Sequence, residues 1–177
     1  MTRIFYPKEH YTKKYRGELF PLLKAFIKGT SFTNIDRVTM YGVSEKDYRF
    51  VDNIAKCDIA ILTMSWNYYQ RTQQLFLAEE LLKEVAKLDK KVITHTTGDF
   101  GVSIPYYKNC IVIRPNGYVS KLPENHVGIP VFIGDPLKNI RFETKPLFTA
   151  NTDIPSYAFA MLLINSMIRT VLPTPIE

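Results

Sequence analysis

The sequence predicts an α/β fold in which a doubly wound, mostly parallel sheet is flanked by helices. Residues 57–64 ("CDIAILTM") are apolar at consecutive positions, as in a strand that helices cover on both faces. Short apolar segments alternate along the chain with amphipathic segments of helical spacing. At 177 residues, of which 46% are hydrophobic, the chain has the size of one domain and enough apolar side chains for its core. These features are typical of a Rossmann-like domain.

The strands are predicted from short apolar runs that end in Gly, Pro, Asn or Ser. A right-handed βαβ connection between successive runs would place them parallel in one sheet. In chain order the predicted strands are residues 3–7, 37–42, 57–64, 90–96, 110–115 and 131–136.

Three helices are predicted before the last of these strands. The first covers 19–27, with Pro21 in its first turn. The second opens at Ser44, whose spacing from Asp47 is that of a capping box. The third and longest covers 73–88. The apolar face expected for the second helix consists of Tyr48, Val51, Ile54 and Ala55.

Two parts of the chain are expected to differ in organisation. Residues 1–145 form the predicted Rossmann-like domain, and residues 146–177 form a C-terminal tail with one docking helix. Polar residues interrupt the apolar segment 154–172, so we expect no membrane span. An apolar stripe of this helix is expected to be buried, either on the same domain or in a homodimer. The stripe consists of Tyr157, Met161, Ile164 and Ile168.

Composition limits the function. Lys and Arg number 23 against 17 Asp and Glu, and the formal charge of +6 favours anionic partners. Cys57 and Cys110 each begin an apolar run, as buried thiols do in a reducing compartment. The N-terminus lacks the continuous apolar segment of a signal peptide. We therefore expect a cytoplasmic protein.

Several chemistries leave no motif in the sequence. His10, His95 and His126 are too scattered for a metal-ligand pattern, and neither cysteine lies in a CxxC pair. No Walker loop, no G-x-G-x-x-G and no G-x-S-x-G is present. The basic start, "YPKEHYTKKYR", has no nucleic-acid module around it. We expect no metal, no cofactor and no nucleic acid.

Polar clusters follow three of the predicted strands, at residues 65–69, 96–101 and 114–118. The carboxyl ends of parallel strands form the edge where open α/β sheets bind ligands. Aromatic rings beside amides, hydroxyls and carboxylates are typical of a sugar site. We expect the three clusters to surround one concavity. The predicted binding residues are Trp66, Asn67, Tyr68, Thr97, Arg114 and Asn116.

Each prominent residue of these clusters also has a purely structural interpretation. Asp99, in "GDFG", either approaches a ligand through a glycine turn or accepts hydrogen bonds from loop amides. His95 either reaches a substrate or is a core histidine. Trp66 either lines a binding surface or fills the edge of the core. Arg114 is held either by an anionic ligand or by a partner such as Asp135.

The order of motifs over residues 3–138 resembles the N-terminal half of bacterial exostosin-type glycosyltransferases. Its sharpest parts are "MSWNYY", "GDFG" and "GYVSKLP". The resemblance implies a GT-B enzyme of cell-surface polysaccharide synthesis, in which this domain binds a glycan or lipid-linked acceptor without a metal. It also implies that the clusters face the acceptor, with Asp99 or His95 as the base that deprotonates its hydroxyl.

The tail departs from the pattern of that family, because residues 149–177 contain no further βα units. We therefore expect the donor-binding half to be absent. A nucleotide sugar then binds only where a second domain or chain supplies the site, and the chain alone transfers no sugar. Two alternatives remain open: a non-catalytic binding or regulatory module, and a small flavodoxin-like nucleotide-processing enzyme such as a deoxyribosyltransferase. The lack of a recognisable catalytic carboxylate pair disfavours the second.

Overall fold

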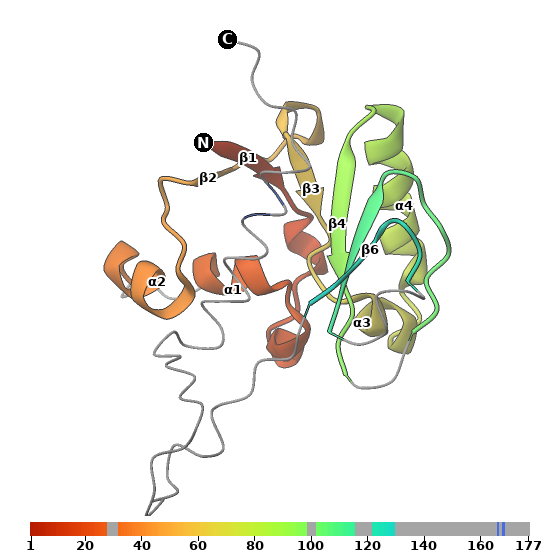
Figure 1. Ribbon diagram of the computed structural model, residues 1–177, viewed down its shortest axis with the longest axis horizontal. Coiled ribbons are helices and arrows are strands. Elements are labelled where there is room, and N and C mark those ends of the chain that lie inside the picture. The colour runs from red at the N-terminus through yellow and green to blue at the C-terminus, as the bar shows by residue number, and fades with distance from the viewer. Residues whose placement is uncertain (28–31, 99–101, 116–121, 130–165, 167, 169–177) are drawn as a thin grey trace, which may run out of the picture.

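The computed structural model describes residues 1–27, 32–98, 102–115, 122–129, 166 and 168. Its centre is one six-stranded sheet, and every pair of neighbouring strands is parallel. Helices flank this sheet (Figure 1), so the predicted Rossmann-like α/β fold is confirmed. The strands are β1 (Thr2–Phe5), β2 (Tyr48–Phe50), β3 (Ile59–Ile61), β4 (Lys91–His95), β5 (Cys110–Arg114) and β6 (His126–Gly128).

The strand order is β2-β1-β3-β4-β5-β6. The chain leaves β1 for the edge strand β2 and then returns to the other side of β1 to form β3. The direction of winding therefore reverses between β1 and β3, as it does in flavodoxin-like doubly wound sheets.

Burial of β3 explains its consecutive apolar residues. All three of its side chains are buried, because neighbouring strands and helices enclose it on every side. The helix α4 covers part of this core with one apolar side, as its sequence predicts. The side chains that α4 buries are Ala78, Leu81, Leu82 and Val85.

The helices are mostly short. Pro21 occupies the first turn of α1, where its missing N–H costs nothing. The α-helices are α1 (Pro21–Phe26), α2 (Asn34–Tyr41), α3 (Trp66–Arg71) and α4 (Leu75–Lys87). The 3-10 helices are η1 (Lys8–His10), η2 (Lys13–Glu18) and η3 (Ile54–Lys56).

The prediction of a strand at 37–42 is wrong, because these residues belong to α2 and its C-cap. Thr33 and Asp36 form a complete capping box in front of them, which satisfies amides at the helix start. Gly42 ends the helix in the left-handed conformation, with φ of 65°. Local capping therefore overrides the β-branched residues within "RVTMYG".

The prediction of a helix after Ser44 is also wrong. The Ser44 amide donates to the Asp47 carboxylate, at 3.1 Å, but this contact closes a turn. Tyr48 then begins β2, which pairs with β1 along its whole length. Pairing with a neighbouring strand supplies hydrogen bonds that the sequence pattern cannot reveal.

Other predicted features have mixed outcomes. Both cysteines are buried and free. β6 was not predicted, and the strand expected at 131–136 lies outside the described residues. In the tail, Ser166 and Ile168 are helical and Ile168 is fully buried in the core, while the rest of the predicted stripe lies outside the described residues. No helix among the described residues is long and apolar enough to cross a membrane.

The capping box of α2 gives a first prediction. Thr33→Ala removes the hydroxyl that accepts from the Asp36 amide, so the free energy of unfolding should fall by about 0.5–2 kcal/mol. Thr39→Ala, at an exposed position inside the same helix, is the matched control and should have little effect. Chemical denaturation measures both. Equal effects of the two variants would contradict the role of the cap.

Candidate functional site

The carboxyl ends of β3 and β4 point toward the side of the molecule where α3 lies (Figure 1). Ser65 follows β3 and caps α3, because its hydroxyl oxygen accepts from the Tyr68 amide at 3.0 Å. Thr97 follows β4, and its amide donates to the side-chain oxygen of Asn67 at 2.9 Å. Asn67 therefore fixes the loop after β4 against α3. This edge is the place where open parallel sheets bind ligands.

A segment from before α1 crosses this edge. Leu19 forms an isolated antiparallel bridge with Met64, and the Phe20 amide donates to the Thr63 carbonyl at 2.9 Å. The Ser65 amide donates to the Glu18 carbonyl at 2.8 Å. These backbone bonds hold Glu18, the last residue of η2, above the ends of β3 and β4.

The carboxylate of Glu18 accepts three hydrogen bonds from side chains. Its Oε2 accepts from Ser65 Oγ at 2.5 Å and from Thr97 Oγ1 at 2.7 Å. Its Oε1 accepts from Arg71 Nη2 at 2.9 Å. We call Glu18, Ser65, Arg71 and Thr97 the Glu18 cluster. Its members come from three separate parts of the chain.

Burial raises the pKa of Glu18, but the hydrogen bonds from Ser65, Thr97 and Arg71, with the charge of Arg71, lower it more. The net result is a pKa below the usual value of 4.5, so the carboxylate is ionised at neutral pH. Its side chain is 17% exposed, which leaves it within reach of a ligand.

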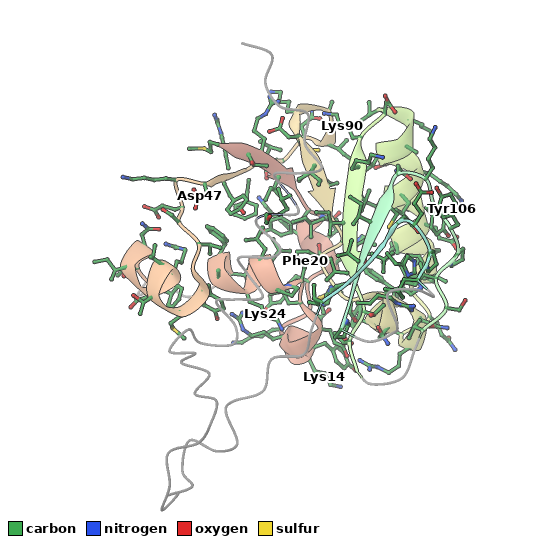
Figure 2. All side chains as sticks on the ribbon, in the orientation of Figure 1. Lys14, Phe20, Lys24, Asp47, Lys90 and Tyr106 are labelled. Atoms are coloured by element: carbon green, nitrogen blue, oxygen red, sulfur yellow. The ribbon has the colours of Figure 1, made fainter. Side chains whose placement is uncertain are left out.

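Basic side chains lie around this carboxylate. Arg71 pairs with it directly and remains 56% exposed. The Lys24 ammonium donates to the Gly17 carbonyl at 2.9 Å, and burial followed by the nearby Arg16 lowers the pKa of Lys24. Figure 2 shows Lys14 and Lys24 on the side of the molecule toward which the strands run. The surroundings of Glu18 therefore favour an anionic or hydroxyl-rich ligand.

The two aromatic residues expected to stack on a sugar are buried. Trp66 is 1% exposed and packs against Tyr107 with ring centroids 6.1 Å apart. Tyr68 is 4% exposed, and its hydroxyl lies 3.2 Å from Thr12 Oγ1. Both rings belong to the core, in keeping with the structural interpretation of Trp66.

His95 lies at the end of β4 on the face that packs against Phe20, with ring centroids 5.3 Å apart. It is buried, and its Nδ1 has no hydrogen-bond partner among the described residues. Burial, then the charge of Lys24, lowers its pKa to about 3. Such an imidazole is a weak base at neutral pH, which favours the interpretation of His95 as a core residue.

The remaining predicted residues are not brought together in the described part of the chain. Asp99 and Asn116 lie outside the described residues. Arg114 ends β5, and its guanidinium donates to the Val102 carbonyl. Asp135, the alternative partner of Arg114, also lies outside the described residues. The predicted concavity around Trp66, Asp99 and Arg114 therefore remains a prediction.

Glu18 is not among the residues that the sequence predicts for the site, whereas its neighbours in the hydrogen-bond network, Asn67 and Thr97, are. Polar residues directly after a strand are the sequence signal for such a site, whereas Glu18 precedes a helix and reaches the sheet edge only because its segment folds back. The one available signal was an acid directly before the apolar run "LFPLL".

No protein-family model, no curated protein and no solved structure matches this chain.

The Glu18 cluster offers a carboxylate acceptor, two hydroxyls and a guanidinium donor within one small region. This mixture suits a ligand with several hydroxyl groups, because each hydroxyl both donates and accepts. Among the described residues, no group of three or more His, Cys, Asp or Glu side chains is placed to hold a metal ion.

Replacing the carboxylate tests its contribution to stability. Glu18→Gln should lower the free energy of unfolding at neutral pH by about 1–3 kcal/mol, because charge-assisted hydrogen bonds are lost. Since the folded pKa of Glu18 is lowered, the difference from wild type should be full above pH 4.5 and shrink as the pH falls through that folded pKa.

Urea denaturation at several pH values measures this difference. Glu84→Gln, an exposed change of the same chemistry on α4, is the control and should leave stability almost unchanged at every pH. A constant difference between wild type and Glu18→Gln down to the acid transition would show that Glu18 does not titrate as described.

His95 gives a second pH dependence. Its pKa is 6.5 when exposed and about 3 when folded, so below pH 6.5 the unfolded chain binds a proton that the folded chain does not. Wild type should therefore lose stability as the pH falls from 6.5 toward 3, by at most about 1.4 kcal/mol per pH unit. His95→Phe should lack this part of the slope. Parallel curves for the two proteins would contradict the neutral buried imidazole.

Proposed function

We propose that this chain is a glycosyltransferase-like domain that binds an acceptor glycan or lipid-linked sugar at the Glu18 cluster. The observation that carries the proposal is a partly buried, ionised carboxylate at the carboxyl edge of a parallel sheet, with hydroxyl groups beside it. Sugar sites use this combination, because a carboxylate can accept from one or two hydroxyls of the ring.

The hydrogen-bonding capacity of Glu18 supports the proposal. Oε2 accepts two side-chain bonds and Oε1 accepts one, whereas a carboxylate offers about four acceptor positions. Oε1 therefore has capacity left for a sugar hydroxyl. The exposed Arg71 beside it can donate to a neighbouring sugar oxygen.

In this proposal Glu18 binds and orients the acceptor. The lowered pKa of Glu18 makes it a poor general base. The buried His95, with its lowered pKa, is also a poor general base and is shielded from the ligand. Asp99 therefore stays the proposed base. The nucleotide sugar is held by a second domain or a second chain, and the reduced thiols of Cys57 and Cys110 support a cytoplasmic location.

A flavodoxin-like nucleotide-processing enzyme is the second candidate, because the strand order places a switch point between β1 and β3. At that switch point, however, the segment of residues 18–20 covers the ends of the strands, and its Leu19 and Phe20 are fully buried. This favours binding farther along the edge, between β3 and β4. Release of free base from a nucleoside by the purified chain would support the second candidate.

The proposal is tested by titrating ¹⁵N-labelled protein with methyl glycosides of glucose, galactose, N-acetylglucosamine and glucuronic acid. We expect at least one sugar to shift the amide signals of Ser65 and Thr97. Glu18→Gln should weaken that binding roughly ten-fold, since a charge-assisted hydrogen bond is lost. Glu84→Gln should bind as wild type does. Shifts confined to other surfaces, or equal binding by Glu18→Gln, would refute the site.

A further inference from the structure

We propose that Thr96, Arg114 and His126 form a subsite for a phosphoryl group, next to the Glu18 cluster. This inference rests on the proposed function, because it assigns a phosphoryl group to the acceptor. Together with Thr94, these residues form a row on one face of the sheet, which we call the β4–β6 polar row.

The strand register places the row on one face. Thr94 pairs with Val112, which in turn pairs with His126, so Thr94 and His126 lie on the same face of three neighbouring strands. Arg114 follows Val112 by two positions and therefore shares that face. The Thr96 amide donates to the Ile113 carbonyl at 3.0 Å, which continues the ladder and sets Thr96 beside Arg114. His95 lies on the opposite face, against Phe20.

Within the part of the chain that the structure describes, each of these four residues has a side-chain atom that is shielded from solvent and has no hydrogen-bond partner. Burial of an unpaired polar atom is unfavourable, and buried polar groups in folded proteins are normally paired. Five such atoms on one sheet face are the observation from which the proposed bound group is argued. The atoms are Thr94 Oγ1, Thr96 Oγ1, Arg114 Nε, His126 Nδ1 and His126 Nε2.

The chemistry of the row indicates the charge of that group. Arg114 forms none of the ion pairs found among the described residues, and its described bond goes to the neutral Val102 carbonyl. Burial, then the positive charge of Arg114, lowers the pKa of His126. A bound anion would offset the unfavourable effect of the Arg114 charge on a protonated His126, and it would accept hydrogen bonds from the donors that lack a partner. Guanidinium and hydroxyl groups together suit the several oxygens of a phosphoryl group.

The row adjoins the Glu18 cluster through the backbone. Thr96 and Thr97 are consecutive residues after β4, and Thr97 Oγ1 donates to Glu18. One ligand can therefore place hydroxyl groups at Glu18 and a phosphoryl group at Arg114. A sugar phosphate and a lipid-linked sugar diphosphate both have this chemistry.

The experiment compares wild type with Thr96→Val, Arg114→Gln and the control Arg49→Gln, which removes an exposed charge from β2. Melting temperature is measured in phosphate and in chloride at equal ionic strength, and phosphate affinity by calorimetry. Phosphate should stabilise wild type and Arg49→Gln. Thr96→Val should bind phosphate roughly ten-fold more weakly, and Arg114→Gln should lose binding.

Thr96→Val keeps the experiment decisive even if Arg114→Gln fails to fold. In chloride its melting temperature should equal or exceed that of wild type, because the change removes an unpaired buried hydroxyl. If Thr96→Val instead melts lower and gains as much from phosphate as wild type, the hydroxyl is satisfied by a structural water and the subsite is refuted. No stabilisation of wild type by phosphate, or stabilisation by glucuronate alone, also refutes it.

Two further probes separate the sources of the phosphoryl group. Glucose 1-phosphate binding that both Thr96→Val and Glu18→Gln weaken would assign a sugar phosphate to the two sites together. Geranyl diphosphate binding that only Thr96→Val weakens would assign a lipid diphosphate. Phosphate binding without any response to the methyl glycosides would refute the sugar site and leave the subsite standing. Binding of a methyl glycoside without any binding of phosphate would refute the subsite alone.

Discussion

The return of residues 18–20 to the sheet is the interaction on which the site depends. Three backbone contacts, at Glu18, Leu19 and Phe20, attach this segment to the end of β3. They bury Leu19 and Phe20 over the reversal point of the sheet and leave the Glu18 side chain at its rim. Without this attachment, Glu18 would be an ordinary acidic residue of a surface helix. With it, a carboxylate meets Ser65 and Thr97, which the sequence separates by 47 and 79 positions from Glu18.

The polar residues at the end of β4 lie on two different faces of the sheet and therefore have different surroundings. His95 enters the apolar side against Phe20, where its neutral form is favoured and no titration is expected near neutral pH. Thr94 and Thr96 lie on the other face, beside Arg114 and His126, and all four side chains have an atom without a partner among the described residues. Thr97 follows the strand and joins Glu18. Alternation along one strand therefore places a core histidine on one face and two threonines of the polar row on the other, and the next residue, Thr97, donates to the carboxylate of the proposed sugar site.

The errors in the predicted fold have local physical causes. "RVTMYG" has the composition of a strand, yet the capping box of Thr33 and Asp36 and the left-handed Gly42 make it a helix. Ser44 and Asp47 have the spacing of a cap, yet hydrogen bonds from β1 make the following residues a strand. Both segments lie at the edge of the domain, where burial imposes no strong pattern. The central elements β3, β4 and α4 were predicted correctly. Strands buried on both faces have consecutive apolar residues, and a helix buried on one side has apolar residues at helical spacing, so the sequence shows both patterns.

The sequence by itself determined the α/β class, the parallel core strands and the edge at which polar side chains collect. Apolar periodicity and strand ends are local properties, so a single chain displays them. Only the tertiary structure decided which polar residues face one another. Trp66, Tyr68 and His95, which the local composition predicts to contact a ligand, are buried in the structure. Glu18, Thr96 and His126, which the sequence does not single out for binding, become candidate binding residues there. The reason is that a side chain's partner depends on strand register and on the path of a returning loop, and both are set by packing between distant segments.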